Sequence, residues 1–300
     1  MAHLLDLTTQ GDVGTLADPG KLASVKLMTP QQLYELWERR PWSAHAIDLE
    51  RDKADWAALD PELRRDIAWS LSSFFVGEER VTTQFSGLVM AYETQSEEAF
   101  LTTQQVDEAR HTQHFDRFYA QVLAMDGTFD ERLERARDAV SPDFVKLFDH
   151  YLVDAGKALV ADPSDVGAKV DFVTTYHMII EGTLALTGQY FQTAWMEREG
   201  ILPGHLFGFR KISQDEHRHV AYGTWFLQQK AGDPAHAQRI QNVLMATLPA
   251  AAGVLVPPGH ELGDEYEFMG YSSREMNEFA FTALSRRLKV IGVGLPTVPA

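Results

Sequence analysis

The stretch Glu108-Ala109-Arg110-His111 occurs a second time, with one residue changed, as Glu216-His217-Arg218-His219. Each copy lies in a long segment whose apolar residues recur at helical spacing. Because residues three positions apart lie on the same face of a helix, each copy directs a carboxylate and an imidazole to the same side. The repeat therefore predicts two helices whose carboxylate and imidazole groups can face each other.

Two further carboxylates are expected on apolar helices that precede these pairs. Glu181 is the only formally charged residue between Asp171 and Glu197. An unpaired carboxylate is costly to bury, so something must compensate its charge. Farther upstream, Glu78 lies on the apolar stripe of its helix, whereas its neighbour Glu79 can pair with a base or face solvent.

These side chains have the composition of a dinuclear metal centre, with ligands Glu78, Glu108, His111, Glu181, Glu216 and His219. In ferritin-like bundles, two Glu-x-x-His pairs and one Glu from each of two further helices hold two iron or manganese ions. Four carboxylates balance two divalent cations, and without metal these crowded acids would take up protons. Oxygen-rich ligands with two imidazoles and no thiolate favour iron or manganese over structural zinc. One Glu-x-x-His pair alone would be an ordinary solvated helix face.

The composition of the whole chain is that of one domain, residues 1–300. The chain has 300 residues, of which 45% are hydrophobic, and no low-complexity linker divides it. It has no cysteine, which excludes disulfides and thiolate chemistry. A net charge of −16 disfavours nucleic acids and anionic membranes as partners. The first residues lack the basic segment and apolar core of a signal peptide, so we expect a cytoplasmic protein.

The apolar periodicity predicts an all-α protein without a β-hairpin signal. Long helices are expected at 61–93, 97–125, 130–160, 166–199 and 201–231, with shorter ones near 233–252 and 273–291. Residues 1–29 are expected to form an irregular arm, and residues 255–272 a loop. The apolar run around Glu181 is long enough to raise the question of a membrane span, but its Thr, His and Gln residues favour a helix buried in protein.

The chain resembles the small subunit of class I ribonucleotide reductase, a ferritin-like helical bundle, in the order of its ligands: Glu78, Glu108 with His111, Glu181, and Glu216 with His219. Residues 42–56 resemble the early segment of that family, in which a Trp precedes an acidic, arginine-containing stretch. Asp215 matches the family's aspartate that links this Trp to a histidine ligand. The resemblance thus implies that Trp42, Asp215 and His111 are joined, which would fix the imidazole tautomer. Without it, Trp42 would be read as a core aromatic.

Two features depart from the radical-carrying reductase subunits. Those subunits have a Tyr four residues after the first histidine ligand, whereas this chain has Phe115, which cannot store a tyrosyl radical. Some reductase subunits also carry Phe there and keep the oxidising equivalent on a manganese/iron centre, so Phe115 alone does not exclude that role. The subunits end in a tail with a Tyr and acidic residues, but the residues after Lys289 include neither.

Residues 77–82, 176–188 and 215–224 resemble three signatures of the ligand-binding oxidases that are similar to this small subunit. That branch has a manganese/iron or di-iron centre and a long-chain fatty acid bound at the metals. In it, a Val three residues after the first ligand Glu is joined by an ether bond to a Tyr five residues before the third ligand Glu. Those positions hold Val81 and Tyr176. By packing alone, both would be core residues.

The resemblance implies a dioxygen-activating oxidase with one Mn and one Fe, or two Fe, that binds a long-chain fatty acid, forms a Val81–Tyr176 crosslink and assembles as a homodimer. One alternative is a reductase small subunit of the Mn/Fe type. Another is a diiron oxygenase such as an N-oxygenase or fatty-acyl desaturase, although N-oxygenases have a further His where this chain has Ile212. A ferritin-like storage role would leave the Val and Tyr unexplained.

Two points stay open at the metal site. Both positions present oxygen and imidazole ligands, so the sequence does not assign a metal to either. The spacing between Glu78 and Glu108 is short for the branch, which implies a tight turn at residues 94–98. If that turn shifts the register, Glu79 would replace Glu78 as a ligand.

Overall fold

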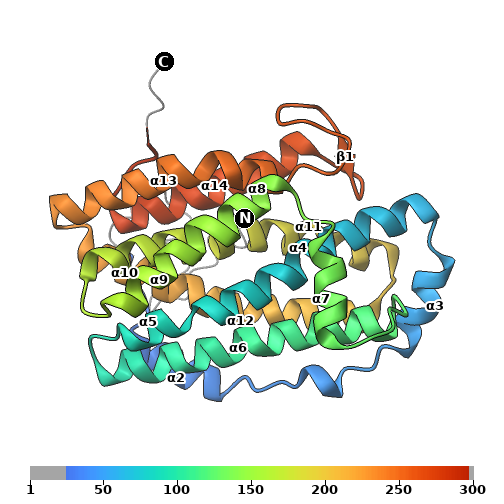
Figure 1. The fold of residues 1–300 in the computed structure, drawn as a ribbon, viewed down its shortest axis with the longest axis horizontal. Coiled ribbons are helices and arrows are strands. Elements are labelled where there is room, and N and C mark those ends of the chain that lie inside the picture. Colours follow the sequence, from blue (N-terminus) through green and yellow to red (C-terminus); the bar gives the residue numbers. More distant parts are fainter. Residues whose placement is uncertain (1–24, 297–300) are drawn as a thin grey trace.

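The computed structural model describes residues 25–296 and confirms the all-α class (Figure 1). A single two-stranded antiparallel hairpin, β1 (Glu267–Phe268) with β2 (Tyr271–Ser272), interrupts the helices of this part of the chain. In chain order, the helical elements are α2 (Pro30–Glu38), η3 (Ala44–Ala46), α3 (Glu50–Ala58), α4 (Pro61–Gln84), α5 (Ser86–Met90), α6 (Gln95–Gln121), α7 (Phe129–Arg137), α8 (Pro142–Phe144), η4 (Val145–Leu152), α9 (Val153–Ala161), α10 (Val166–Val173), η5 (Thr174–Ala185), α11 (Leu186–Glu199), α12 (Pro203–Lys230), α13 (Pro234–Val254) and α14 (Ser273–Ile291). Of these, η3 is a 3₁₀ turn, and η4 and η5 are π-helical.

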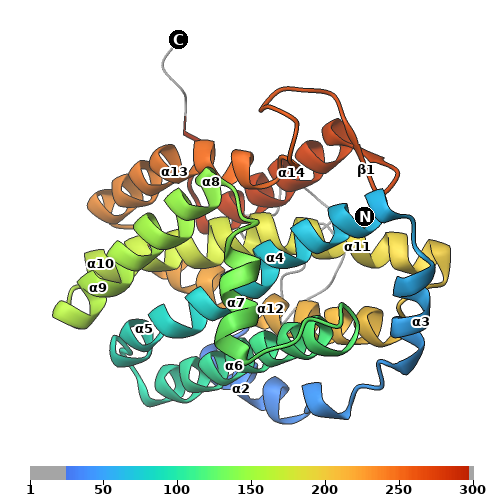
Figure 2. The same cartoon turned by 45° about the vertical axis from the view of Figure 1, so that its right-hand side comes forward.

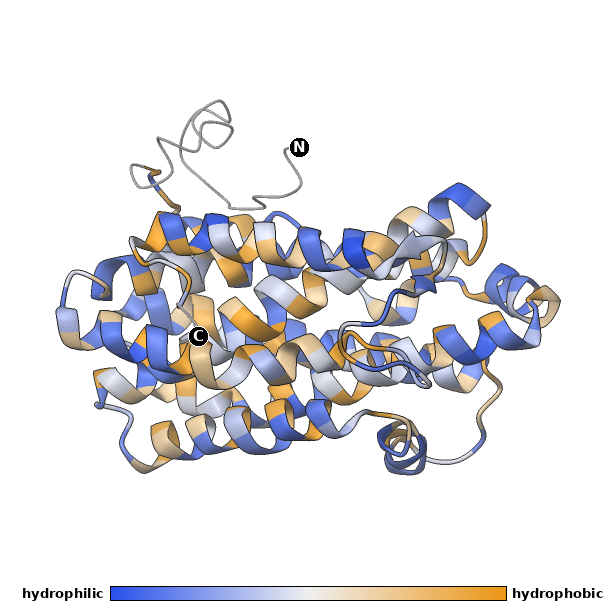
Figure 3. Cartoon of the chain, turned by 90° about the horizontal axis from the view of Figure 1, so that it is seen from above, coloured by the Kyte–Doolittle hydropathy of each residue, from blue (hydrophilic) through white to orange (hydrophobic). Residues whose placement is uncertain are grey.

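The long helices pack side by side as a bundle (Figures 1 and 2). Helix α6 lies between α4 and α2, and α12 packs against η5 and α11. Helices α13 and α14 also pack against η5, and α14 contacts α12 as well. The helices carry apolar and polar residues on the same ribbon, as amphipathic helices around a shared core do (Figure 3). One buried apolar cluster draws on residues from Leu33 to Ile291.

Several helices begin where the sequence supplies a capping side chain. Thr29 and Ser272 form capping boxes at the starts of α2 and α14. Helix α12 instead begins after Leu202, whose φ of 51° is in the left-handed region and whose side chain cannot cap. The carboxylate of Asp52, on α3, accepts hydrogen bonds from the backbone of Gly204 and His205 at 2.9 and 2.6 Å. A distant helix thus caps the helix that carries the second Glu-x-x-His pair.

Some predicted boundaries were wrong. The helix expected at 130–160 is broken between α7 and α8, where Ser141 caps a new start at Pro142. The helix expected at 61–93 ends at residue 84 and is followed by the short α5. Helix α3 was not predicted, and the loop expected at 255–272 contains the hairpin β1–β2. Of the arm expected at 1–29, residues 1–24 lie outside the described residues.

The helix around Glu181 is enclosed by protein on all sides. Thr174, His177 and Glu181 are each at most 3% exposed. Among the described residues, no helix combines the length and the apolar character that crossing a membrane requires. The polar residues of this segment therefore face other helices, as the sequence suggested.

Candidate metal centre

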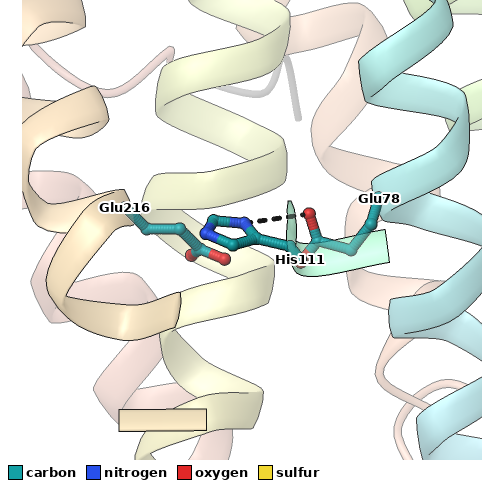
Figure 4. A group of neighbouring side chains, drawn as sticks. All are labelled: Glu78, His111 and Glu216. Carbon is teal, nitrogen blue, oxygen red and sulfur yellow. Dashed lines mark ion pairs between the residues drawn. The ribbon is translucent and has the colours of Figure 1, made fainter. Parts of the chain in front are cut away.

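Six buried side chains from four elements converge in the centre of the bundle. Their donor atoms form two groups of three, and within each group all donor atoms lie within 4.8 Å of one another. The first group, drawn in Figure 4, joins α4, α6 and α12, and the second joins α6, η5 and α12. None of the six is more than 7% exposed. The groups are Glu78, His111 and Glu216, and Glu108, Glu181 and His219.

Glu108 lies between the two groups. Its Oε2 is 3.7 Å from Nδ1 of His111, and its Oε1 is 3.0 Å from Nδ1 of His219. Glu78 approaches Nδ1 of His111 at 3.3 Å, and Glu181 approaches Nδ1 of His219 at 2.8 Å. One carboxylate therefore directs an oxygen to each half of the site, as a carboxylate that bridges two metal ions does.

The donor set fits a pair of divalent cations. Oε2 of Glu181 and Oε2 of Glu216 are buried without a hydrogen-bond partner. Leaving a buried polar atom unpaired costs about 1–3 kcal/mol, and more when the group is charged. Four carboxylates and two imidazoles match the harder transition metals better than they match a structural zinc ion. The two Glu-x-x-His pairs and the two further glutamates supply these donor groups.

Protonation compensates the crowded carboxylates when metal is absent. Burial raises the pKa of Glu78 to about 8 and that of Glu181 to about 7, and it raises the pKa of Glu216 well above its ordinary value. Burial acts on Glu108 in the same direction, but its contacts with the imidazoles of His111 and His219 hold its pKa well below the ordinary value. Metal ions would replace the bound protons, so metal binding is coupled to proton release.

The chain of hydrogen bonds expected behind His111 is present. Nε1 of Trp42 donates to Oδ2 of Asp215 at 2.6 Å, and this oxygen lies 3.3 Å from Nε2 of His111. The carboxylate therefore accepts the proton on Nε2, which leaves Nδ1 free to face the cluster.

A second chain of the same kind, absent from the sequence-based predictions, supports His219. Nε1 of Trp37 donates to Oδ1 of Asp107 at 2.9 Å, and Oδ2 of Asp107 lies 3.2 Å from Nε2 of His219. Asp107 immediately precedes Glu108, so the repeat is five residues long: Asp-Glu-x-Arg-His. That extended repeat was a visible signal for this residue.

The two Trp–Asp–His chains, which we call the supports of His111 and His219, cross between the two motifs and are joined by one arginine. The aspartate that precedes each Glu-x-x-His pair contacts the histidine of the other pair. The guanidinium of Arg218 donates to Asp107 at 2.9 Å and to Asp215 at 2.6 Å. All three side chains are about 1% exposed. The geometry of one half of the site thus depends on residues of the other half.

The structure also locates the two residues whose roles the sequence left open. Glu79 points away from the six-residue cluster and pairs with Arg137 at 3.6 Å. Phe115 is fully buried and packs against the rings of Phe74 and Phe209 at centroid distances of 5.8 Å. Phe115 thus places a hydrocarbon ring, without a hydroxyl group, in this part of the core.

The hydroxyl of Tyr176 lies against the second group of carboxylates. It is 2.6 Å from Oε1 of Glu108 and 2.5 Å from Oε1 of Glu181, and it accepts a hydrogen bond from Gln104 at 3.0 Å. Burial and the two acids raise its pKa well above the ordinary value. The phenol therefore stays protonated and hydrogen-bonded to the carboxylates.

The π-helical geometry of η5 makes this contact possible. Residues five positions apart lie on nearly opposite faces of an α-helix but come close together in a π-helix, whose hydrogen bonds join residues five apart. Tyr176 and Glu181 have this spacing. The hydroxyl of Thr183 likewise bonds the carbonyl oxygen of Met178, five residues earlier, at 2.7 Å. Gly182 fits the widened turn, because a Cβ there would lie 2.6 Å from the backbone oxygen of His177.

An apolar cavity leads away from the cluster. Both Val81 and Tyr176 line it, together with the carboxylates of the cluster, Glu78, Glu108, Glu181 and Glu216. Its walls are aromatic and aliphatic, and include Phe74, Phe144, Phe148, Ile180, Leu184 and Phe191. The cavity is thus acidic where it meets the cluster and apolar along its walls.

The sequence matches the family described as "Ribonucleotide reductase, small chain" over residues 22–293. The chain belongs to the ribonucleotide reductase small-chain family. This confirms the predicted ferritin-like bundle of the reductase small-subunit type. The members of the family are oxidoreductases, so the predicted enzyme class is confirmed as well.

Solved structures similar to this small-chain family member include R2-like ligand-binding oxidases. One with an aerobically reconstituted Mn/Fe cofactor is 25% identical, with a TM-score of 0.73, and the match covers 87% of this chain and 92% of that chain. A variant with an anaerobically reconstituted Mn/Fe cofactor is 25% identical, with a TM-score of 0.74 and coverages of 88% and 93%. The small-chain fold is therefore shared along almost the whole length of both proteins.

Proposed function

We propose that this chain is a dioxygen-activating oxidase with a dinuclear Mn/Fe centre, or a di-iron centre. The observation that carries the proposal is the pair of three-residue donor groups with Glu108 between them. The Mn/Fe cofactors of the two similar oxidases support it. When bound, two such metals supply electrons for cleaving the O–O bond of dioxygen. The proposed ligands are Glu78, Glu108, His111, Glu181, Glu216 and His219.

Tyr176 and Val81 are the proposed sites of an internal oxidation. The phenol is positioned by Glu108 and Glu181, which can accept its proton. An ether bond from the Tyr176 oxygen to Cβ of Val81 requires loss of the O–H and Cβ–H hydrogens. The two electrons and two protons pass to dioxygen. The apolar walls of the cavity exclude water, which protects the oxidising equivalents from side reactions.

The proposed ligand of the cavity is a long-chain fatty acid. Its carboxylate would face the metal ligands at the inner end, and its chain would lie along the apolar walls. We further propose that residues 1–300 act as one domain and that two copies form a homodimer.

A reductase small subunit of the Mn/Fe type is the second candidate. The chain Trp42–Asp215–His111, which resemblance to the reductase subunit predicted, favours it. Both candidates need the same metal ligands. They differ at Tyr176 and Val81, because a reductase subunit has no use for a crosslink there.

Metal binding and oxygen uptake test the proposal directly. Metal-free protein would be loaded anaerobically with Mn(II) and Fe(II) and then exposed to dioxygen, while bound metal and oxygen consumption are measured. We expect two metal ions per chain and oxygen uptake in the wild type and in Glu79→Gln, the matched control. Glu78→Gln should lose metal and uptake. If only Glu79→Gln lost metal, the assigned ligand set would be wrong.

A further inference from the structure

The cavity reaches from the proposed metal ligands to side chains that are partly exposed to solvent. The glutamates at its inner end are at most 7% exposed. Its other end is lined by the half-buried side chains of Trp69, Ser70 and Leu255. A ligand that enters from solvent must therefore pass this outer end.

The hairpin β1–β2 covers that end. Met269 and Gly270 form its turn with φ values of 53° and 77°, and Phe268 pairs with Tyr271 across it. Positive φ at both central residues is typical of the tightest hairpin turns. The turn directs Phe268 inward, where it lines the cavity and is only 8% exposed. Figure 1 shows the hairpin at one end of the bundle.

An aromatic pair closes the outer end. The ring of Phe268 meets the ring of Trp69, on α4, edge to face at a centroid distance of 5.7 Å and an angle of 83°. Met276, at the start of α14, and Val254, at the end of α13, line the cavity beside this pair. Three helices and the hairpin thus meet where the end of an acid chain would lie.

An exposed side chain adds polar contacts between the tip of the hairpin and the bundle. The guanidinium of Arg198, on α11, donates to the backbone oxygen of Met269 at 3.0 Å and lies over the ring of Tyr271 at 5.3 Å. The Arg198 side chain is 47% exposed. Hydrogen bonds of Tyr266 and Ser273 fix the base of the hairpin instead. The tip is also held by apolar packing, because Met269 is 8% exposed and the ring of Tyr271 lies 4.8 Å from the ring of Phe191 on α11.

We propose that the hairpin is the gate of the ligand cavity: Phe268 and Trp69 limit the length of the acid that binds, and Arg198 contributes to holding the gate shut. This inference rests on the proposed acid ligand. An acid whose carboxylate reaches the metal ligands must extend its chain towards the aromatic pair. A chain longer than the cavity collides with the two rings, whereas a shorter one fits beneath them.

Competition between acids of different length tests the gate. Metal-loaded protein would be equilibrated with an equimolar series of straight-chain saturated acids, repurified and extracted, and the bound acids measured by mass spectrometry. Phe268→Ala should shift the bound population to longer acids, with about tenfold enrichment over wild type. Phe281→Ala removes an exposed Phe from α14, outside the cavity, and should leave the distribution unchanged.

Two further variants distinguish a change in ligand selection from misfolding of the hairpin in Phe268→Ala. Trp69→Leu alters the other ring of the pair from a different element and should produce the same shift to longer acids. Arg198→Ala should speed release of bound acid several-fold without changing the preferred length. An unchanged length distribution in both Phe268→Ala and Trp69→Leu would overturn the gate. If no acid bound to wild type or to any variant, the proposal that the cavity binds an acid would be refuted, and the proposed gate would be refuted as well.

Discussion

Asp107→Asn is expected to weaken one metal position, the one that contains His219. Asp107 is 1% exposed and accepts hydrogen bonds from Trp37 and Arg218, while Nε2 of His219 lies 3.2 Å from its carboxylate. The substitution keeps the size of the side chain but removes the anionic acceptor. An amide can offer its nitrogen to the imidazole, which would favour the wrong tautomer.

The expected loss of metal affinity in Asp107→Asn follows from the role of Asp107 as the hydrogen-bond acceptor behind His219. Loss of a hydrogen-bonding partner behind a metal ligand typically costs 10–100-fold in affinity, or about 1.4–2.7 kcal/mol. Because the supports are crossed, the affected position is that of Glu108, Glu181 and His219, although Asp107 belongs to the other motif. Asp215→Asn is the matched control and should weaken the position that contains His111.

Anomalous diffraction at the Mn and Fe edges, from crystals prepared at limiting metal, would report the occupancy of each position. Competition titration in solution would supply the affinities. Occupancy should fall at opposite positions in the two variants. Depletion of the same position by both substitutions, or of the His111 position by Asp107→Asn, would refute the crossed support.

Three other outcomes are expected. Apparent metal affinity should fall as pH drops from about 8 towards 6. In this range Glu78, with a pKa of about 8, and Glu181, with a pKa of about 7, take up protons that the metal must displace. Metal titrations at a series of pH values measure this. Burial lowers the pKa of His205 to about 3, so between about pH 6.5 and pH 3 the unfolded state binds a proton that the folded state does not. The contribution of this side chain to stability is therefore full above about pH 6.5 and falls by about 2 kcal/mol at pH 5. Denaturant unfolding of His205→Phe should lose that part of the pH dependence. Glu97→Gln should lower the free energy of unfolding by about 1–3 kcal/mol, because buried Lys169 loses the carboxylate at 2.6 Å and keeps only Glu93, at 3.5 Å, as an ion-pair partner. An unchanged denaturation midpoint would contradict this.

The bundle was predictable from sequence because its long helices carry local signals. Apolar periodicity and capping residues are contained within each segment, and the two Glu-x-x-His pairs indicate which helices face each other. Helix α3 carried no such signal. It is short, and its contribution, the capping of α12 by Asp52, joins residues about 150 positions apart. The hairpin was missed because each of its strands has only two residues.

The candidate ligands were predictable for the same reason, but the shape of the site was not. Glu181 is recognisable in the sequence as an isolated charge in an apolar run, but no local sequence feature indicates that this run is π-helical. That geometry depends on distant partners, such as Arg287, whose guanidinium bonds the backbone oxygen of Gly182. The role of Asp107 could have been predicted from the sequence, because Asp107 precedes Glu108 just as Asp215 precedes Glu216.

Peptide mass spectrometry of the oxygen-exposed Mn/Fe protein tests the central claim most directly. The protein would be reconstituted anaerobically, exposed to air and digested, with Tyr176→Phe treated in parallel. The account predicts a joined species that contains the Val81 and Tyr176 peptides and is two hydrogens lighter than their sum, present in wild type and absent from Tyr176→Phe. Separate, unmodified peptides from fully metallated, air-exposed wild type would contradict it and favour the reductase-subunit candidate.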